Sequence, residues 1–193
     1  MVPASPELAE LLKSSGAILR GHFLLTSGRH SDVYFEKFRV LERPDVLSAL
    51  CSEIAEHFRG SKIDLVAGPT TGGIIIAFEV AKQLGIPAVY IESEDGKKKL
   101  RRGASIAPGS RVLVVDDVLT TGTSIYEVLD VLKEQGASPT GIGVLIDRSE
   151  TPPDFGCEMF AAYKVEAKSY APDEVPDWLE QIPVSKPGTR NLP

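Results

Sequence analysis

The sequence is poor in cysteine, has no long apolar run and carries no excess of positive charge. Cys51 and Cys157 are the only cysteines among 193 residues, and neither has a neighbour at metal-ligand spacing. This pattern indicates reduced thiols rather than a disulfide framework. No apolar stretch approaches the roughly 20 residues that span a bilayer, and residues 1–7 lack the basic start and apolar run of a signal peptide. The sequence therefore predicts a cytoplasmic protein that binds no membrane.

The net charge of −6 argues against a nucleic-acid partner, because such a protein needs a basic surface that displaces counterions from phosphates. Hydrophobic residues make up 42% of the chain and charged residues 25%. Both values are near the average of folded domains, so a folded chain is expected.

The apolar pattern predicts one domain in three parts. Residues 1–43 hold a helix after Pro6 and a hairpin-like pair of stretches at 18–25 and 33–40. Residues 44–150 begin with a helix and then alternate strand and helix, which predicts an α/β core with a mostly parallel sheet flanked by helices. Residues 151–193 are rich in proline and show no long helix, so a short irregular C-terminal extension is expected. The core strands are expected at 63–67, 88–91, 111–115 and 141–146, and the helices between them at 74–84 and 124–135.

The strongest chemical signal is the segment from residue 112 to residue 124. A buried strand ends there at two adjacent acids, Asp116 and Asp117, and ligands of open α/β sheets bind at such strand ends. Adjacent acids suit neither a strand nor a core, so we expect them to bind sugar hydroxyls, a metal or a developing positive charge. Residues 120–124 then supply hydroxyls and N–H groups at a helix start, which attracts phosphate. A plain capped turn is the alternative, but it explains one cap residue and not the whole run.

Two further segments fit a site for a polyanion. Residues 68–73, Gly-Pro-Thr-Thr-Gly-Gly, again lie between a strand and a helix, where glycines let a ligand approach the backbone. A tight turn without a ligand is the alternative there. Residues 92–103 hold a run of cations that forms either a solvated loop or a mobile lid over a polyanionic leaving group, and we favour the lid. Its cations are Lys97, Lys98, Lys99, Arg101 and Arg102.

Residues 112–124 are neither a P-loop nor a dinucleotide fingerprint, because the required glycine and lysine spacing is missing. They resemble the phosphoribosyl-diphosphate (PRPP) motif of type I phosphoribosyltransferases, and residues 68–73 resemble the pyrophosphate loop of that family. The resemblance implies the type I fold with a small N-terminal hood. It also implies that Asp116 and Asp117 bind the ribose and act in catalysis. The PRPP-binding residues implied are Asp116, Asp117, Val118, Leu119, Thr120, Thr121, Gly122, Thr123, Ser124, Thr70, Thr71 and Gly72.

Within this family the chain is most similar to orotate phosphoribosyltransferases, in particular to a shorter branch known from thermophilic bacteria. Thr120 stands where 6-oxopurine enzymes have an acid, and residues 21–31 with Tyr34 and Phe35 resemble the hood that covers the base. Arg148 follows a strand in the context of the orotate-binding arginine, whose planar fork suits a carboxylate. The resemblance thus implies orotate contacts from Thr120, Arg148, Tyr34 and Phe35. Core filling by the aromatic pair and a surface ion pair of Arg148 are the alternatives.

The chain also departs from the enterobacterial branch of these enzymes. Thr26 and Gly72 stand where that branch has lysines. The lid of that branch has an Arg-Lys pair and a later histidine, whereas the stretch here begins Glu92-Ser93-Glu94 and no histidine follows. Residues 97–102 are the candidates to substitute in the lid, and Lys37 is the candidate in the hood.

The resemblance implies that PRPP and orotate are converted to orotidine 5′-monophosphate and pyrophosphate. It implies Mg²⁺ as cofactor, held through PRPP, with direct ligation by Asp116 and Asp117 left open, and a homodimer in which the lid of one subunit reaches the site of the other. Two alternatives stay open. One is transfer to another nucleobase, and the other is a non-catalytic regulator that senses PRPP.

Overall fold

The structure is a computed structural model, and it describes residues 6–187 apart from positions 26, 95, 102 and 166. Its larger sheet has six strands in the order β5-β4-β3-β6-β7-β8. All neighbours are parallel except β4 and β5, which form an antiparallel hairpin. The mostly parallel sheet expected from the alternation is confirmed. Its strands are β3 (Leu65–Pro69), β4 (Ala88–Glu94), β5 (Lys97–Leu100), β6 (Arg111–Leu119), β7 (Ser138–Asp147) and β8 (Glu158–Lys164).

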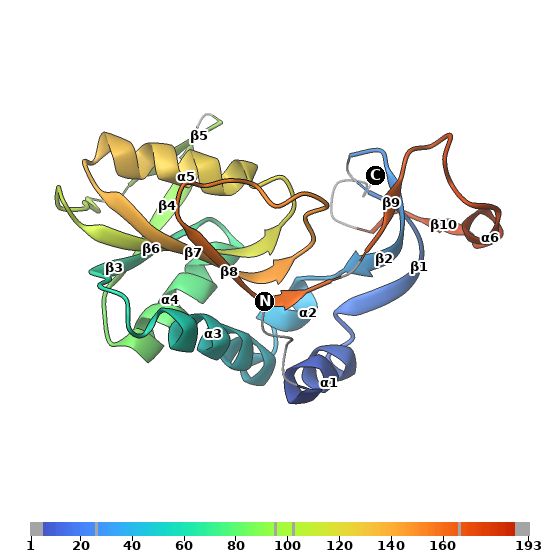
Figure 1. Cartoon of the computed structure of the whole chain (residues 1–193), viewed down its shortest axis with the longest axis horizontal. Helices are drawn as coiled ribbons and strands as arrows, with labels where there is room; N and C mark the ends of the chain where they lie inside the picture. Colours follow the sequence, from blue (N-terminus) through green and yellow to red (C-terminus); the bar gives the residue numbers. More distant parts are fainter. Residues whose placement is uncertain (1–5, 26, 95, 102, 166, 188–193) are drawn as a thin grey trace.

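Helices cover both faces of this sheet (Figure 1). On one face lie α3 (Pro44–Phe58) and α4 (Gly72–Leu84), and on the other lies α5 (Thr123–Glu134). Strand β6 contributes side chains to the cores on both faces of the sheet, because its residues alternate between the faces. Leu113 and Val115 pack into the core below α3 and α4, whereas Val112 and Val114 pack into the core below α5. The same alternation directs the side chains of the next two residues of β6, Asp116 and Asp117, to opposite faces of the sheet.

A second sheet forms the hood beside the core (Figure 1). Its strand order is β10-β1-β2-β9, so its two inner strands come from the N-terminal part of the chain and its two outer strands from the C-terminal part. Short helices precede and follow these strands. The elements of the hood region are α1 (Pro6–Ser14), β1 (Ile18–Leu24), β2 (His30–Phe35), α2 (Phe38–Leu41), β9 (Ser169–Tyr170), α6 (Asp177–Glu180) and β10 (Val184–Ser185).

Three expectations need correction. Residues 151–187 are not simply irregular, because β8 pairs with β7 and the strands β9 and β10 pair with the edges that β2 and β1 leave open. Residues 92–103 are not an unpaired loop, because β4 continues to Glu94 and pairs with β5. Strand β6 does not end at the acids but runs on to Leu119, paired with β7. In the described part of the chain, no helix is long and apolar enough to cross a bilayer.

Candidate active site

Asp116 lies on β6 with its side chain toward α5. The residue is 6% exposed, and its carboxylate accepts hydrogen bonds from the Asp117 backbone N–H at 2.8 Å and from the Ser124 hydroxyl at 2.5 Å. Burial raises the pKa of Asp116 to about 6, and the charge of Asp117 acts in the same direction, although both hydrogen bonds and Lys37 counteract the shift. The predicted pair is thus present, with one acid tied to the first turn of α5.

Asp117 points to the opposite face of β6, toward α4 and the hood. Its Oδ2 accepts a hydrogen bond from Lys37 Nζ at 2.7 Å, and its Oδ1 accepts one from the Val118 N–H. A Cβ atom at Gly72 would lie 2.2 Å from Asp117 Oδ2. Only a residue without a side chain allows this approach, so the β3–α4 turn with Thr70 and Thr71 lies directly against the acid pair, as the sequence led us to expect.

The turn from β6 into α5 is the segment for which the sequence predicts a phosphate cradle. Gly122 is the N-cap of α5 with φ of 79°, and a Cβ atom there would meet the Phe155 ring at 2.7 Å. As a glycine it offers no side chain to cap the helix, so the first-turn N–H groups remain available to an anion. Thr121 and Thr123 are exposed and share a hydrogen bond between their hydroxyls at 2.9 Å.

The side chain of Leu119 belongs to the core and is 1% exposed. Its carbonyl oxygen accepts a hydrogen bond from the Arg148 N–H at 2.9 Å. This bond ties the residue after β7 to the end of β6 and places Arg148 beside Thr120. Any contact of Leu119 with PRPP is therefore restricted to its backbone.

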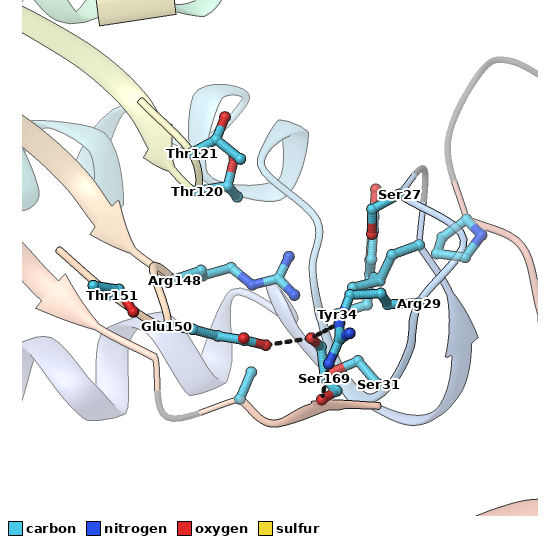
Figure 2. A pocket seen from close by; sticks show the side chains of 13 residues that line it. Ser27, Arg29, Ser31, Tyr34, Thr120, Thr121, Arg148, Glu150, Thr151 and Ser169 are labelled. Atoms are coloured by element: carbon cyan, nitrogen blue, oxygen red, sulfur yellow. Dashed lines mark hydrogen bonds between the residues drawn. The ribbon is translucent and has the colours of Figure 1, made fainter. Parts of the chain in front are cut away.

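A cavity of about 550 Å³ opens between the ends of β6 and β7 and the hood. Figure 2 shows the Arg148 guanidinium reaching from the core toward Tyr34 and the other hood residues, with Thr120 and Thr121 at the end of β6. The cavity is lined by Leu25, Ser27, Arg29, Ser31, Tyr34, Thr120, Thr121, Arg148, Glu150, Thr151, Ala167, Ser169 and Pro187.

Arg148 is poorly satisfied in this cavity. One terminal nitrogen donates to the Val33 carbonyl at the long distance of 3.4 Å, and the buried Nε has no hydrogen-bond partner among the described residues. Burial lowers the pKa of Arg148 and raises that of Tyr34. A buried guanidinium with a free donor calls for an anionic acceptor, since burial of an unpaired charge is unfavourable.

The two hood aromatics do not act together. Tyr34 lines the cavity, but Phe35 is 5% exposed and packs in the core with Val33. Adjacent strand residues point to opposite faces, so one of the two rings had to face away from the cavity. The expectation that Phe35 covers the base is corrected, and it fills the core instead.

The described lid cations do not line the cavity of their own chain. Lys97 and Lys98 lie on β5 without facing the cavity. Lys99 pairs with Glu94 at 3.4 Å, and Arg101 pairs with Glu94 at 3.2 Å, across the β4–β5 hairpin. Arg102 and Thr26 lie outside the described residues.

Sequence reasoning missed a chain of hydrogen bonds that closes the cavity. Arg29 donates to the Ser169 hydroxyl at 2.6 Å and to the Ser169 carbonyl at 2.8 Å, and the Ser169 hydroxyl donates to Glu150 (Figure 2). These residues join the hood, β9 and the loop after β7. Arg29 belongs to the segment 21–31 that resembles the hood, but no motif marks Ser169 or Glu150 as its partners, because they lie far from it in sequence.

Comparison with known proteins adds independent information on the family. Residues 41–156 match the family model of the phosphoribosyl transferase domain. An orotate phosphoribosyltransferase of Pelotomaculum thermopropionicum is 46% identical over 96% of this chain and 98% of its own length. One of Chlorobium phaeobacteroides is 44% identical over 96% of both chains. The chain belongs to the orotate phosphoribosyltransferase family.

The crystal structure of the orotate phosphoribosyltransferase from Aeropyrum pernix has the same fold. It matches with a TM-score of 0.71 at 33% identity, over 82% of this chain and 94% of that one. The type I phosphoribosyltransferase fold expected from residues 112–124 is thereby confirmed. Thr120 and Thr121 line the Arg148 cavity, whereas Asp116 and Asp117 do not; the acid pair lies earlier on the same strand, β6.

Proposed function

We propose that the protein transfers the phosphoribosyl group of PRPP to orotate and releases pyrophosphate. The observation that carries this proposal is the half-buried Arg148, which lines the cavity next to the end of β6 and whose buried Nε has no hydrogen-bond partner in the described part of the chain. Orotate is a flat base with a carboxylate, and a guanidinium is the side chain that best binds this group. Tyr34 would lie against the ring, and Thr120 would contact its edge.

The remaining residues suit PRPP. The N-terminal turn of α5, with Thr121, Gly122, Thr123 and Ser124, would bind the 5-phosphate through N–H groups and hydroxyls. Asp116 and Asp117 would accept hydrogen bonds from the ribose hydroxyls, with the backbone around Val118 completing this wall. Thr70, Thr71 and Gly72 lie against Asp117 and would border the diphosphate.

In the reaction, the bond from the anomeric carbon to the diphosphate oxygen breaks, and its electron pair leaves with pyrophosphate. A ring nitrogen of orotate supplies the electron pair of the new bond from the opposite side, and the proton of that nitrogen passes to water or to the released pyrophosphate. Positive charge develops at the anomeric carbon in between, and the two carboxylates lower the energy of this state. Both reacting groups belong to the two substrates and no side-chain nucleophile is needed, so catalysis consists chiefly of positioning and electrostatics.

Mg²⁺ is the cofactor that this chemistry implies. Among residues 6–187, with four positions left out, no group of three or more His, Cys, Asp and Glu side chains could hold a metal ion. The acid pair alone fits Mg²⁺, which commonly uses one or two carboxylates and takes its other ligands from substrate phosphates and water. Asp116 and Asp117 would hold the ion together with PRPP, and the ion would neutralise charge on the diphosphate.

A homodimer is also part of the proposal. Helix α4 leaves Ile75 and Phe78 exposed one turn apart, at 43% and 58%, and Tyr90 on β4 and Phe38 on α2 are exposed as well. Such apolar surface favours a second subunit. A lid shared between subunits would explain why the β5 cations lie away from their own cavity.

The free thiols of Cys51 and Cys157 suit the reducing cytoplasm.

Pyrophosphate release with PRPP, Mg²⁺ and single bases tests the function. We expect release with orotate and none with uracil, adenine or hypoxanthine. Uracil is the sharpest comparison, because it is orotate without the carboxylate that Arg148 would bind. Release with another base would refute the orotate assignment, and tight PRPP binding without any release would favour the regulator.

A further inference from the structure

Lys37 contacts the acid pair from the hood side. Its Nζ lies 2.7 Å from Asp117 Oδ2, and its side chain is 41% exposed, whereas that of Asp117 is 12% exposed. The ammonium thus lies within hydrogen-bond distance of one of two adjacent buried acids and is a direct counter-ion of that pair.

The position of Lys37 conflicts with ribose binding. Asp117 Oδ1 already accepts the Val118 N–H, and Oδ2 is walled on one side by the backbone of Gly72. A ribose hydroxyl that binds Asp117 must therefore compete with the Lys37 ammonium for the open side of Oδ2. The ammonium has a long flexible stem and a solvent-exposed side, so it can leave without any change in the fold.

The diphosphate of PRPP is the anion nearest to the released ammonium, because it is attached beside the ribose hydroxyls. Other cations are poorly placed for it within the described residues. Lys99 and Arg101 are engaged with acids of their own hairpin, and Arg148 lies at the base end of the cavity. Gly72 has no room for a cationic side chain beside Asp117.

We infer that Lys37 is an exchangeable counter-ion, which holds Asp117 in the empty site and moves to the diphosphate of bound PRPP. This inference rests on the proposed function in that it takes PRPP as the ligand. It assigns Lys37 a role in binding the leaving group. Lys37 would thus supply a cation for the diphosphate in a chain that has glycine at position 72, where the enterobacterial branch has lysine.

Equilibrium binding of two ligands to Lys37→Met separates the two parts of the proposed role, which are the pairing with Asp117 and the contact with the diphosphate. Ribose 5-phosphate has the hydroxyls and the 5-phosphate but no diphosphate, so it only needs to displace the ammonium. We expect Lys37→Met to bind ribose 5-phosphate as tightly as the wild type or more tightly. We expect the variant to bind PRPP about tenfold or more weakly, since a charge-assisted contact is lost. Both are measured by calorimetry with Mg²⁺ and without orotate.

Weaker PRPP binding without weaker ribose 5-phosphate binding supports the exchange. Equal weakening of both ligands would overturn it, because Lys37 would then only orient Asp117, and unchanged PRPP binding would overturn it as well. Lys37→Arg keeps the charge and should recover most of the PRPP affinity. Lys82→Met is the matched control, because Lys82 pairs with the partly buried Glu79 at 3.2 Å on α4, and it should bind both ligands like the wild type.

The result is independent of the base. Suppose that the wild type releases no pyrophosphate with orotate, but that Lys37→Met weakens the binding of PRPP and not that of ribose 5-phosphate. The proposed function then fails and the role of Lys37 stands. If the wild type turns over orotate and the ligands respond alike, the role of Lys37 fails alone. Thermal melting of each variant shows that the fold is intact.

Discussion

Asp116→Asn removes one of two adjacent buried charges and leaves the shape of the site unchanged. The asparagine oxygen can still accept the Asp117 N–H, and its amide can donate to the Ser124 hydroxyl, which reverses that hydrogen bond. The aspartate of the wild type has a folded-state pKa raised to about 6. The fold therefore favours the protonated acid, and this stabilisation is complete below pH of about 4 and is lost as the pH rises through about 6.

The size of this stability difference follows from the pKa shift of Asp116. About two pKa units correspond to roughly 3 kcal/mol between the protonated and the ionised fold. At pH 7.5, the asparagine variant should be more stable than the wild type by about 2–3 kcal/mol, or roughly 5–10 °C in melting temperature for a chain of this length. At pH 4.5, the wild-type acid is mostly protonated, so the difference should shrink by about 2 kcal/mol.

Urea unfolding at pH 4.5 and 7.5 measures both free energies. Asp130→Asn, at an exposed position of α5, is the control and should change stability little at either pH. A variant that is equally stable or less stable than the wild type at pH 7.5, or a difference independent of pH, would refute the reasoning. The same variant should lose most PRPP-dependent turnover, because a ribose ligand and a negative charge beside the anomeric carbon are gone.

Three further predictions concern the cavity, the cradle and the subunit contact. Arg148→Met should raise KM for orotate about tenfold or more and leave KM for PRPP nearly unchanged; a parallel rise of both constants would contradict a base-specific role. Gly122→Ala should lower the melting temperature more than Gly109→Ala, because both glycines have φ near 80° but only Gly122 lies against the Phe155 ring. Equal losses would show that backbone strain alone matters. Phe78→Glu should halve the mass found by light scattering without lowering the melting temperature, and an unchanged mass would refute the proposed interface.

The arrangement of residues in the proposed phosphoribosyl half of the site could be predicted because it is local in sequence. One strand, one turn and one helix start hold Asp116, Asp117 and the cradle, so a run of thirteen residues contains almost the whole geometry. The alternation of side chains along a strand also predicts that the rings of Tyr34 and Phe35 point to opposite faces of β2. It does not predict which of the two rings faces the core, because that depends on how the hood packs against α3.

The base half could not be predicted in the same way. Ser169 contacts Arg29 and Glu150 across long separations in sequence, and no local pattern encodes such a contact. Strands β9 and β10 have two residues each. Segments this short show no measurable period, and they become strands only because β2 and β1 offer open edges.

The hood sheet combines strands from both ends of the chain, and this arrangement sets an order of events during synthesis. When the ribosome has made residues up to β8, every strand of the larger sheet and the whole proposed PRPP cradle are present. The outer hood strands, and the cavity residues Ala167, Ser169 and Pro187, emerge only afterwards. Domains fold as their chain becomes available, so a nascent chain would acquire the phosphate-binding part first. Selection of the base would come last, with the final residues of the described chain.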